Sequence, residues 1–255
     1  MAENKNVVIL GGLGLIGFEV TYICLLKGHN VTVVDQAGID NDKKKKLEKY
    51  NTKFKFYKKK INKEFVNKFF NILKNNDSLI NCLYIDNKVN NTLGIDKLDI
   101  QNFKNTISLN IDSILNLSVE FAKYLVKRKK GGSILNFGSI YSVVAQNPKL
   151  YLNTKINENL PYSFFKSGLV NFTKQLSATY SKYGIRTNLI LPGGVRDINN
   201  PLQDSKFVKK YNSIVPIGRM ARPDEIAYLA EFLISDYSTY ISGAAIPVDG
   251  GWTAI

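Results

Sequence analysis

The chain has 255 residues, 44% hydrophobic and 22% charged, which is ordinary for a soluble globular protein and enough for one α/β domain spanning residues 1–255. Its polar start and the absence of an apolar run of about 18 residues exclude a secretory signal and a transmembrane helix, so we expect a cytoplasmic protein without a membrane partner. The two cysteines, Cys24 and Cys82, lie far apart without Cys or His neighbours, which excludes a disulfide framework and a metal site.

The formal net charge is +14, and lysines cluster at 43–46, 58–60 and 127–130. Solvated lysines that reflect a coding bias explain this charge most simply. Attraction of an anionic substrate, such as a phosphorylated or nucleotide-linked sugar, is a second explanation. No groove-reading helix or stacking-aromatic motif accompanies the charge, so we expect no nucleic-acid partner.

Short apolar runs alternate with longer periodic stretches along the whole chain. The runs predict strands at Asn6–Leu10, Val31–Val34, Lys53–Tyr57, Leu79–Leu83, Ser133–Phe137, Arg186–Leu191 and Ala245–Val248. The periodic stretches predict helices at Leu15–Lys27, Asp42–Tyr50, Lys63–Lys74, Phe103–Lys129, Tyr162–Tyr183 and Pro223–Ser235. This alternation predicts an α/β fold with a doubly wound parallel sheet covered by helices on both faces, and a ligand site at the carboxyl ends of its strands.

A glycine-rich segment, Gly11-Gly-Leu-Gly14-Leu-Ile-Gly17, follows the first strand and opens the first helix. Glycines there allow the backbone to approach a pyrophosphate, and the helix N-terminus supplies N–H donors. Asp35, at the end of the second strand, would accept the hydroxyls of an adenosine ribose and repel a 2′-phosphate, and Gln36 follows it rather than arginine. We therefore expect NAD(H) rather than NADP(H). The alternative is a packing turn with Asp35 as a surface acid.

Two segments have the pattern Tyr-x-x-x-Lys, which places both side chains on one face of a helix: Tyr151 to Lys155 and Tyr162 to Lys166. An ammonium in that position can lower the pKa of a phenol, and such a phenol can exchange a proton with a carbonyl or alcohol. Tyr162 opens a long apolar-periodic helix, whereas Tyr151 lies among loop residues. The context favours the second pair.

Several landmarks together resemble the short-chain dehydrogenase/reductase family over almost the whole chain. They are the glycine loop, Asn136-Phe-Gly-Ser139, Tyr162 with Lys166, Ile185-Arg-Thr-Asn188, Pro192-Gly193 and Val248-Asp-Gly-Gly-Trp252. The resemblance implies a seven-stranded Rossmann-type sheet, hydride transfer between a nicotinamide cofactor and a carbonyl/alcohol pair, and a homotetramer or homodimer.

Residue roles implied by the resemblance carry over where the residues match. Tyr162 would be the general acid/base, Lys166 would lower its pKa and hold the nicotinamide ribose, Ser139 would hydrogen-bond the substrate oxygen, and Asn110 would position a relay water. The implied cofactor-binding residues are Gly11, Gly14, Leu15, Ile16, Gly17, Asp35, Ile61, Asn81, Leu83, Tyr162, Lys166, Pro192, Gly193 and Val195. The simpler alternatives are a strand-end cap for Ser139, a helix-kink residue for Asn110 and a core-edge phenol for Tyr162.

The sequence departs from the family pattern at several places beside the expected cofactor. Leu83 and Tyr84 replace small residues, and Lys60 stands where an acid normally contacts adenine. The spacing between Ser139 and Tyr162 is longer than usual, and we expect the extra segment, roughly Gln146–Leu160, to form a loop over the substrate pocket. These departures leave open a non-catalytic, cofactor-binding regulatory or scaffold protein.

The C-terminal half resembles reductases associated with flagellin modification and surface-glycan (sialic-acid-like sugar) biosynthesis. The family places a mobile substrate loop at about 194–215, where Arg196, Lys206 and Lys209 could hold a phosphate or carboxylate, or the two lysines could form a solvated helix face. Asp197 stands where a threonine often contacts the cofactor amide. Outside this loop, we expect His29 to be a turn residue away from the site and Trp252 to lie at a subunit interface or in the core.

The sequence thus predicts an NAD(H)-dependent oxidoreductase acting on a ketone or secondary alcohol of a sugar or sugar derivative. Reduction of another ketone, such as a 3-oxoacyl thioester, is the enzymatic alternative.

Overall fold

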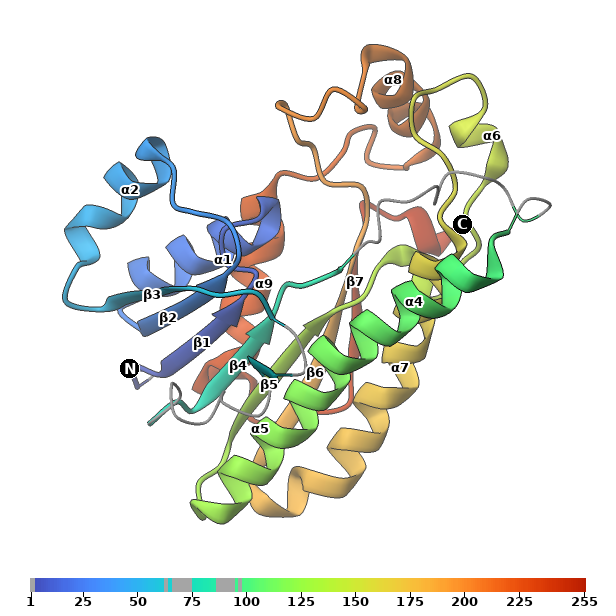
Figure 1. Cartoon of the computed structure of the whole chain (residues 1–255). Coiled ribbons are helices and arrows are strands. Elements are labelled where there is room, and N and C mark those ends of the chain that lie inside the picture. Colours follow the sequence, from blue (N-terminus) through green and yellow to red (C-terminus); the bar gives the residue numbers. More distant parts are fainter. Residues whose placement is uncertain (1–2, 62–63, 66–74, 86–94, 96–97) are drawn as a thin grey trace.

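A computed structural model describes residues 3–61, 64–65, 75–85, 95 and 98–255 of the chain. Within these residues, seven strands form one sheet in the order β3-β2-β1-β4-β5-β6-β7 (Figure 1). The strands are β1 (Asn6–Leu10), β2 (Asn30–Asp35), β3 (Phe54–Lys58), β4 (Ser78–Asn81), β5 (Gly132–Phe137), β6 (Ile185–Pro192) and β7 (Ala245–Val248). Every neighbouring pair is parallel, which confirms the predicted doubly wound sheet.

Helices cover both faces of the sheet (Figure 1). The helices of the described residues are α1 (Leu15–Leu26), α2 (Asn41–Leu47), α4 (Ile100–Asn110), α5 (Asn116–Lys127), α6 (Pro148–Tyr151), α7 (Leu160–Tyr180), α8 (Ser205–Ile214) and α9 (Pro223–Ile234), of which α6 and α8 lie beyond the strand ends. Strand β1 shows why both faces must be covered: Val7 and Ile9 belong to the core under α1 and α9, whereas Val8 and Leu10 belong to the core under α5. Successive side chains of a strand point to opposite faces, so an unbroken apolar run is buried on both.

The predicted helix Phe103–Lys129 is one helical stretch with an irregular centre. It begins earlier, at Ile100, because the side chain of Asp99 accepts a hydrogen bond from the N–H of Asn102 at 3.0 Å. A π-helical turn, Ile111–Leu115, separates α4 from α5. Asn110 is the last residue of α4 before this turn.

Of two other predicted elements, one is not tested and one differs from the structure. The helix expected at Lys63–Lys74 lies outside the described residues except for 64–65. Strand β4 ends at Asn81 rather than Leu83, and the Asn81 side-chain oxygen accepts a hydrogen bond from the Leu83 N–H at 3.4 Å. Leu83 and Tyr84 therefore lie just beyond the strand, at its carboxyl end.

Helices α6 and α8 were not predicted. The extra segment Gln146–Leu160, expected as a loop, contains α6, and the segment 194–215 contains α8. Lys210 of α8 joins the two helices, since its Nζ donates to the carbonyl oxygens of Leu152 at 2.5 Å and Lys149 at 3.2 Å. Whether 194–215 moves as a substrate loop stays a prediction.

His29 and Trp252 are both buried. His29 lies in the turn before β2, away from the carboxyl ends, as expected; its Nδ1 accepts from the Lys5 N–H at 3.0 Å and its Nε2 lies 3.1 Å from a Glu231 carboxylate oxygen. Trp252 stacks on Tyr211 of α8 with ring centroids 4.9 Å apart, so the structure gives it a core contact. None of the helices in the described residues is long and apolar enough to cross a membrane.

Candidate active site

Ser139, Tyr162 and Lys166 meet at the carboxyl end of β5. Ser139 follows the strand, and Tyr162 and Lys166 occupy one face of α7. The side chain of Ser139 hydrogen-bonds that of Tyr162. The Nζ of Lys166 lies 5.6 Å from the centre of the Tyr162 ring. The structure therefore brings together three of the four residues predicted to be catalytic.

Burial sets the protonation behaviour of this pair. It raises the pKa of Tyr162, and the hydrogen bond with Ser139 opposes that rise. It lowers the pKa of Lys166 to about 7, while the Nζ donates to the Phe137 carbonyl oxygen at 2.5 Å. The expected lowering of the Tyr162 pKa by Lys166 is not seen in this structure, where burial is the largest influence on the Tyr162 pKa and raises it.

Ser139 is also the N-cap of a short 3-10 turn, Ile140–Ser142, so its capping role and its contact with Tyr162 coexist. Its oxygen accepts from the Tyr141 N–H at 3.2 Å, and its own N–H donates to the Ser142 hydroxyl at 3.1 Å. The Ser142 hydroxyl donates in turn to the Lys166 carbonyl oxygen at 2.8 Å. Ser142, which the sequence did not single out, thereby ties the Ser139 turn to α7.

Asn110 binds the backbone of the segment after β4. Its amide oxygen accepts from the Ile85 N–H at 2.9 Å, and its amide nitrogen donates to the carbonyl oxygens of Ile85 at 2.7 Å and Thr106 at 2.8 Å. These contacts hold residue 85 against the end of α4. A role in positioning a relay water stays a prediction.

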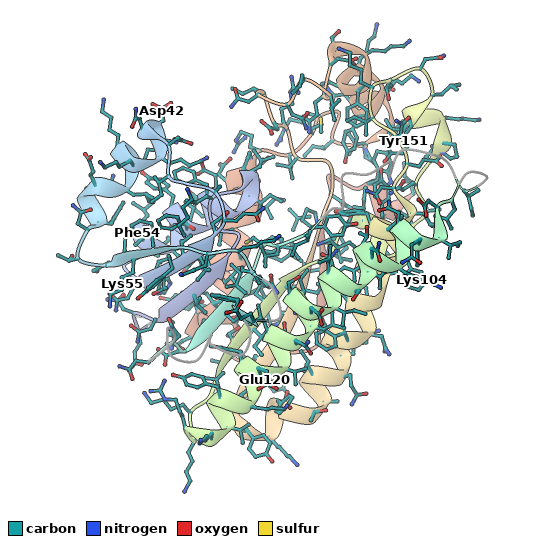
Figure 2. All side chains as sticks on the ribbon, viewed as in Figure 1. Asp42, Phe54, Lys55, Lys104, Glu120 and Tyr151 are labelled. Carbon is teal, nitrogen blue, oxygen red and sulfur yellow. The ribbon has the colours of Figure 1, made fainter. Side chains whose placement is uncertain are left out.

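The competing pair Tyr151 and Lys155 does not share a helical face. Helix α6 ends at Tyr151, and the next residue, Leu152, is extended. The Tyr151 hydroxyl lies 2.5 Å from the hydroxyl of Tyr141, and Figure 2 shows Tyr151 on the side of the molecule where α6 and α8 lie. Burial raises the pKa of Tyr151 to about 12. The choice of Tyr162 over Tyr151 as the helical partner of a lysine is thus supported by the geometry.

The glycine loop lies between β1 and α1. Gly11 has φ +71°, and a Cβ on Gly17 would lie 2.1 Å from the Gly11 carbonyl oxygen. Gly14 is the N-cap of α1 and provides no side-chain cap, so the first N–H groups of the helix face the loop. Leu15 and Ile16 form that first turn. This arrangement fits a pyrophosphate.

Asp35 fastens this loop from the end of β2. One carboxylate oxygen accepts from the Leu13 N–H at 2.9 Å and the other from the Ala37 N–H at 2.9 Å. With 8% of its surface exposed, Asp35 is not a surface acid, so that alternative reading was wrong. The carboxylate sits where a ribose bound at the loop would meet it.

The other expected cofactor residues line the same edge of the sheet. Asn81 is the last residue of β4. Pro192 is the last residue of β6, and Gly193 and Val195 follow it in the chain. Ile61, after β3, is buried in the core under α5. The amide nitrogen of Asn81 is buried and has no hydrogen-bond partner among the described residues, which leaves a donor for a ligand. These residues and the glycine loop fit a dinucleotide.

The three residues that depart from the family pattern lie in different surroundings. Lys60 is exposed after β3. Leu83 packs over the glycine loop, its Cδ2 atom 2.9 Å from where a Cβ on Gly11 would stand. Tyr84 lies against two residues of the candidate site: its ring centroid is 4.8 Å from that of Tyr162 and 5.5 Å from the Nζ of Lys166. The sequence marked Tyr84 as a departure beside the expected cofactor and missed this contact.

The candidate anion-binding residues have different surroundings: one binds within its own loop and two are exposed on a helix. An Arg196 nitrogen donates to Gln203 within the same loop, at 3.0 and 3.1 Å, so the guanidinium braces the loop. Asp197 accepts from the Asn199 N–H at 3.0 Å. Lys206 and Lys209 are exposed on α8, whose buried residues are Phe207 and Tyr211, which supports the reading of a solvated helix face.

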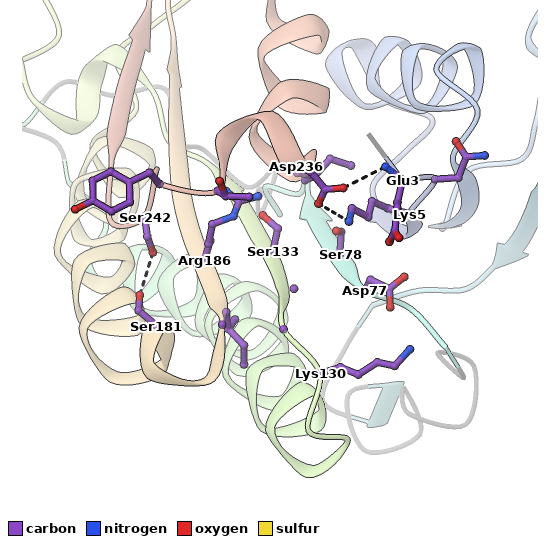
Figure 3. Close-up of a pocket in the computed structure, with 18 residues that line it drawn as sticks. Glu3, Lys5, Asp77, Ser78, Lys130, Ser133, Ser181, Arg186, Asp236 and Ser242 are labelled. Carbon is purple, nitrogen blue, oxygen red and sulfur yellow. Dashed lines mark hydrogen bonds and ion pairs between the residues drawn. The ribbon is translucent and has the colours of Figure 1, made fainter. Parts of the chain in front are cut away.

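A depression of about 750 Å³ lies at the opposite ends of the strands (Figure 3). It is lined by Lys5, Ser78, Ser133 and Arg186, at or near the starts of β1, β4, β5 and β6. Two of its charged residues are paired: a carboxylate oxygen of Asp236 lies 2.5 Å from the Lys5 ammonium, and the Asp236 carboxylate also accepts a hydrogen bond from the Glu3 N–H. Ligands of parallel sheets bind at the carboxyl ends, so this depression is not the candidate site. No group of three metal-binding side chains occurs in the described part of the chain.

Comparison with known proteins agrees with this arrangement. Residues 15–253 match the family described as enoyl-(acyl carrier protein) reductase. A short-chain dehydrogenase from Leptospira borgpetersenii, solved with bound NAD+, is 31% identical with a TM-score of 0.84, over 98% of this chain and 93% of that one. A 4-hydroxyisoleucine dehydrogenase complexed with NADH is 27% identical, with a TM-score of 0.82, over 99% of this chain and 100% of that one.

Among curated relatives, an L-rhamnose-1-dehydrogenase from Scheffersomyces stipitis is 33% identical over 57% of this chain and 54% of its own length. The curated relatives matched in sequence are spanned only in part, from 27% to 65% of their length. Their names are largely those of dehydrogenases and reductases.

The sheet order and the glycine loop define a Rossmann-type fold. Within that class, the chain belongs to the short-chain dehydrogenase/reductase family.

Proposed function

We propose that this protein is an NAD(H)-dependent oxidoreductase that interconverts a ketone and a secondary alcohol, with Ser139, Tyr162, Lys166 and Asn110 as its site residues. The observation that carries the proposal is the meeting of Ser139, Tyr162 and Lys166 beside a glycine loop fastened by Asp35. Bound nicotinamide would supply or accept the hydride.

The residues of the chain handle the substrate oxygen and its proton. Tyr162 gives a proton to the oxygen during reduction and takes it back during oxidation. Ser139, already hydrogen-bonded to Tyr162, holds the same oxygen. Lys166 holds the nicotinamide ribose hydroxyls and, once drawn toward the Tyr162 hydroxyl, stabilises the phenolate. The buried position of Lys166 excludes water that would screen this charge.

We propose NAD(H) over NADP(H) because a 2′-phosphate would be placed beside the Asp35 carboxylate, which is buried and already ordered by two N–H donors. Asp35 would accept the ribose hydroxyls through its remaining lone pairs, and the unpartnered Asn81 amide would donate to the cofactor.

For the substrate we propose a sugar or sugar derivative used in surface-glycan biosynthesis, in the manner of the flagellin-modification subgroup. The similarity to an L-rhamnose-1-dehydrogenase and the basic net charge of +14, which attracts anionic sugars, support this class. A 7alpha-hydroxysteroid dehydrogenase from Paraclostridium sordellii is 32% identical over 60% of the chain, which favours a non-sugar ketone as the second candidate. We further propose a cytoplasmic homotetramer or homodimer.

Thermal unfolding with NADH, NADPH or neither tests the cofactor. A ligand at a hundred times its dissociation constant adds about 2.7 kcal/mol to the free energy of unfolding, so NADH should raise the midpoint by several degrees and NADPH by less. Turnover is then measured on a panel of sugars, nucleotide sugars and non-sugar ketones. Equal stabilisation by NADPH would overturn the Asp35 argument.

Tyr162→Phe separates an enzyme from a scaffold. Loss of about 10²–10⁴-fold in turnover with NADH affinity retained supports the proposed role of Tyr162. Tyr180→Phe, at the other end of α7, is the matched control and should keep full activity. Undiminished turnover by Tyr162→Phe would remove Tyr162 from the mechanism.

A further inference from the structure

Tyr84 lies against both α7 residues of the candidate site. Its ring meets the ring of Tyr162 edge to face, with centroids 4.8 Å apart and planes at 83°. The Nζ of Lys166 lies 5.5 Å from the centre of the Tyr84 ring, nearly the same as its 5.6 Å from the Tyr162 ring. The lysine ammonium therefore lies within the range of cation–π attraction of both rings.

The backbone on both sides of Tyr84 is fixed by side chains of the site. Before it, the Leu83 N–H donates to the Asn81 side-chain oxygen at 3.4 Å. After it, Ile85 is bound through both its N–H and its carbonyl oxygen by the amide of Asn110. Tyr84 thus stands at the centre of a short segment that two asparagines hold in place, and its side chain packs with the core under α7.

We propose that Tyr84 is a positioning residue of the catalytic centre, whose ring holds the Lys166 ammonium and the Tyr162 phenol in their catalytic arrangement. This inference rests on the proposed roles of Tyr162 and Lys166. Edge-to-face packing fixes the plane of the Tyr162 ring, and the face of the Tyr84 ring offsets part of the desolvation of Lys166. The bulky residue at this position is a part of the site rather than an obstruction in it.

The groups that act on Lys166 come from several elements. Among the described residues these are the Cys82 thiol beyond β4, the Phe137 carbonyl oxygen of β5, and the rings of Tyr84 and Tyr162. Burial raises the pKa of the Cys82 thiol, so this thiol carries no charge near neutrality. The two rings and one carbonyl oxygen are then what favours the ammonium over the amine, and removing one ring should lower the pKa of Lys166.

The test is an NMR titration of the full chain labelled with 13Cε-lysine, without cofactor or substrate, which reads the pKa of Lys166 directly. Lys166→Arg assigns the resonance. Tyr84→Phe keeps the ring and should leave the pKa of Lys166 unchanged. Tyr84→Leu keeps apolar bulk without the ring and should lower that pKa by about half a unit or more. Tyr180→Leu, at the far end of α7, is the matched control and should shift nothing.

An unchanged pKa of Lys166 in Tyr84→Leu would overturn the proposal. Far-ultraviolet circular dichroism and thermal unfolding check that each variant is folded, and Tyr84→Met replaces Tyr84→Leu if the latter is not. Because the titration needs no substrate, its result is independent of the turnover measurements on Tyr162→Phe. A failure of the proposed oxidoreductase function and a failure of the Tyr84 inference are therefore distinguishable.

Discussion

The Nζ of Lys166 donates a hydrogen bond to the carbonyl oxygen of Phe137 at 2.5 Å, which ties the middle of the candidate site in α7 to the carboxyl end of β5. Both partners are buried, and the cost of burying the ammonium appears in the lowered pKa of Lys166, about 7. Lys166 is therefore expected to make the free energy of unfolding depend on pH.

Between pH 7 and about 10.4, the usual lysine pKa, the unfolded chain binds the proton that folded Lys166 releases, so Lys166 makes the free energy of unfolding rise with pH. We expect Lys166→Met to reduce that slope by up to about 1.4 kcal/mol per pH unit. Urea unfolding at pH 7, 8, 9 and 10 measures it. Lys104→Met, on the exposed side of α4, is the control (Figure 2). Equal slopes in wild type and Lys166→Met would contradict the lowered pKa.

Gly17 is predicted to be irreplaceable and Gly168 dispensable. A Cβ on Gly17 would stand 2.1 Å from the Gly11 carbonyl oxygen, so Gly17→Ala must displace the loop. NADH affinity should fall at least tenfold, as measured by fluorescence titration. At Gly168, within α7, nothing lies within 4 Å of the added Cβ, and Gly168→Ala should stabilise the protein by about 0.5–1 kcal/mol. Retained NADH affinity in Gly17→Ala would show that the loop does not bind the cofactor.

Asp35 is expected to affect both stability and cofactor choice. Asp35→Ala removes the acceptor of two N–H groups and should cost about 2–3 kcal/mol in urea unfolding. Asp35→Asn keeps one acceptor and should cost less while removing the charge that repels a 2′-phosphate. The ratio of NADPH to NADH dissociation constants should then fall by about tenfold or more. Asp42→Asn, exposed on α2, should leave the ratio unchanged.

His29 should matter for stability and not for turnover. It bridges the Lys5 backbone and Glu231 of α9 at the end of the sheet away from Tyr162. His29→Ala leaves a buried N–H and a carboxylate without this partner, which should cost about 2–4 kcal/mol of unfolding free energy. His29→Asn, with a carbonyl oxygen for the Lys5 N–H, should recover part of it. A large loss of turnover at a temperature where His29→Ala is folded would contradict a purely structural role for His29.

Local patterns in the sequence were sufficient for much of the fold. An unbroken apolar run predicted β1, because a strand buried on both faces has no polar side, and the glycine loop was evident from residues adjacent in the chain. Short elements were missed. Helices α6 and α8 begin at Pro148 and Ser205, and the capping side chains of Asn147 and Asp204 before them are recognisable, but each helix depends on packing with the other.

The sequence by itself determined the alternation of strands and helices that predicts a parallel sheet, the glycine loop and the spacing of Tyr162 and Lys166, because each is a pattern of residues close together in the chain. Only the tertiary structure decided that Tyr84 contacts Tyr162, that Asn110 binds Ile85 and that burial governs the pKa values of Tyr162 and Lys166. These relationships join segments that lie far apart in sequence. Desolvation and cross-segment contacts arise only when folding brings such segments together, so no local pattern of residues encodes them.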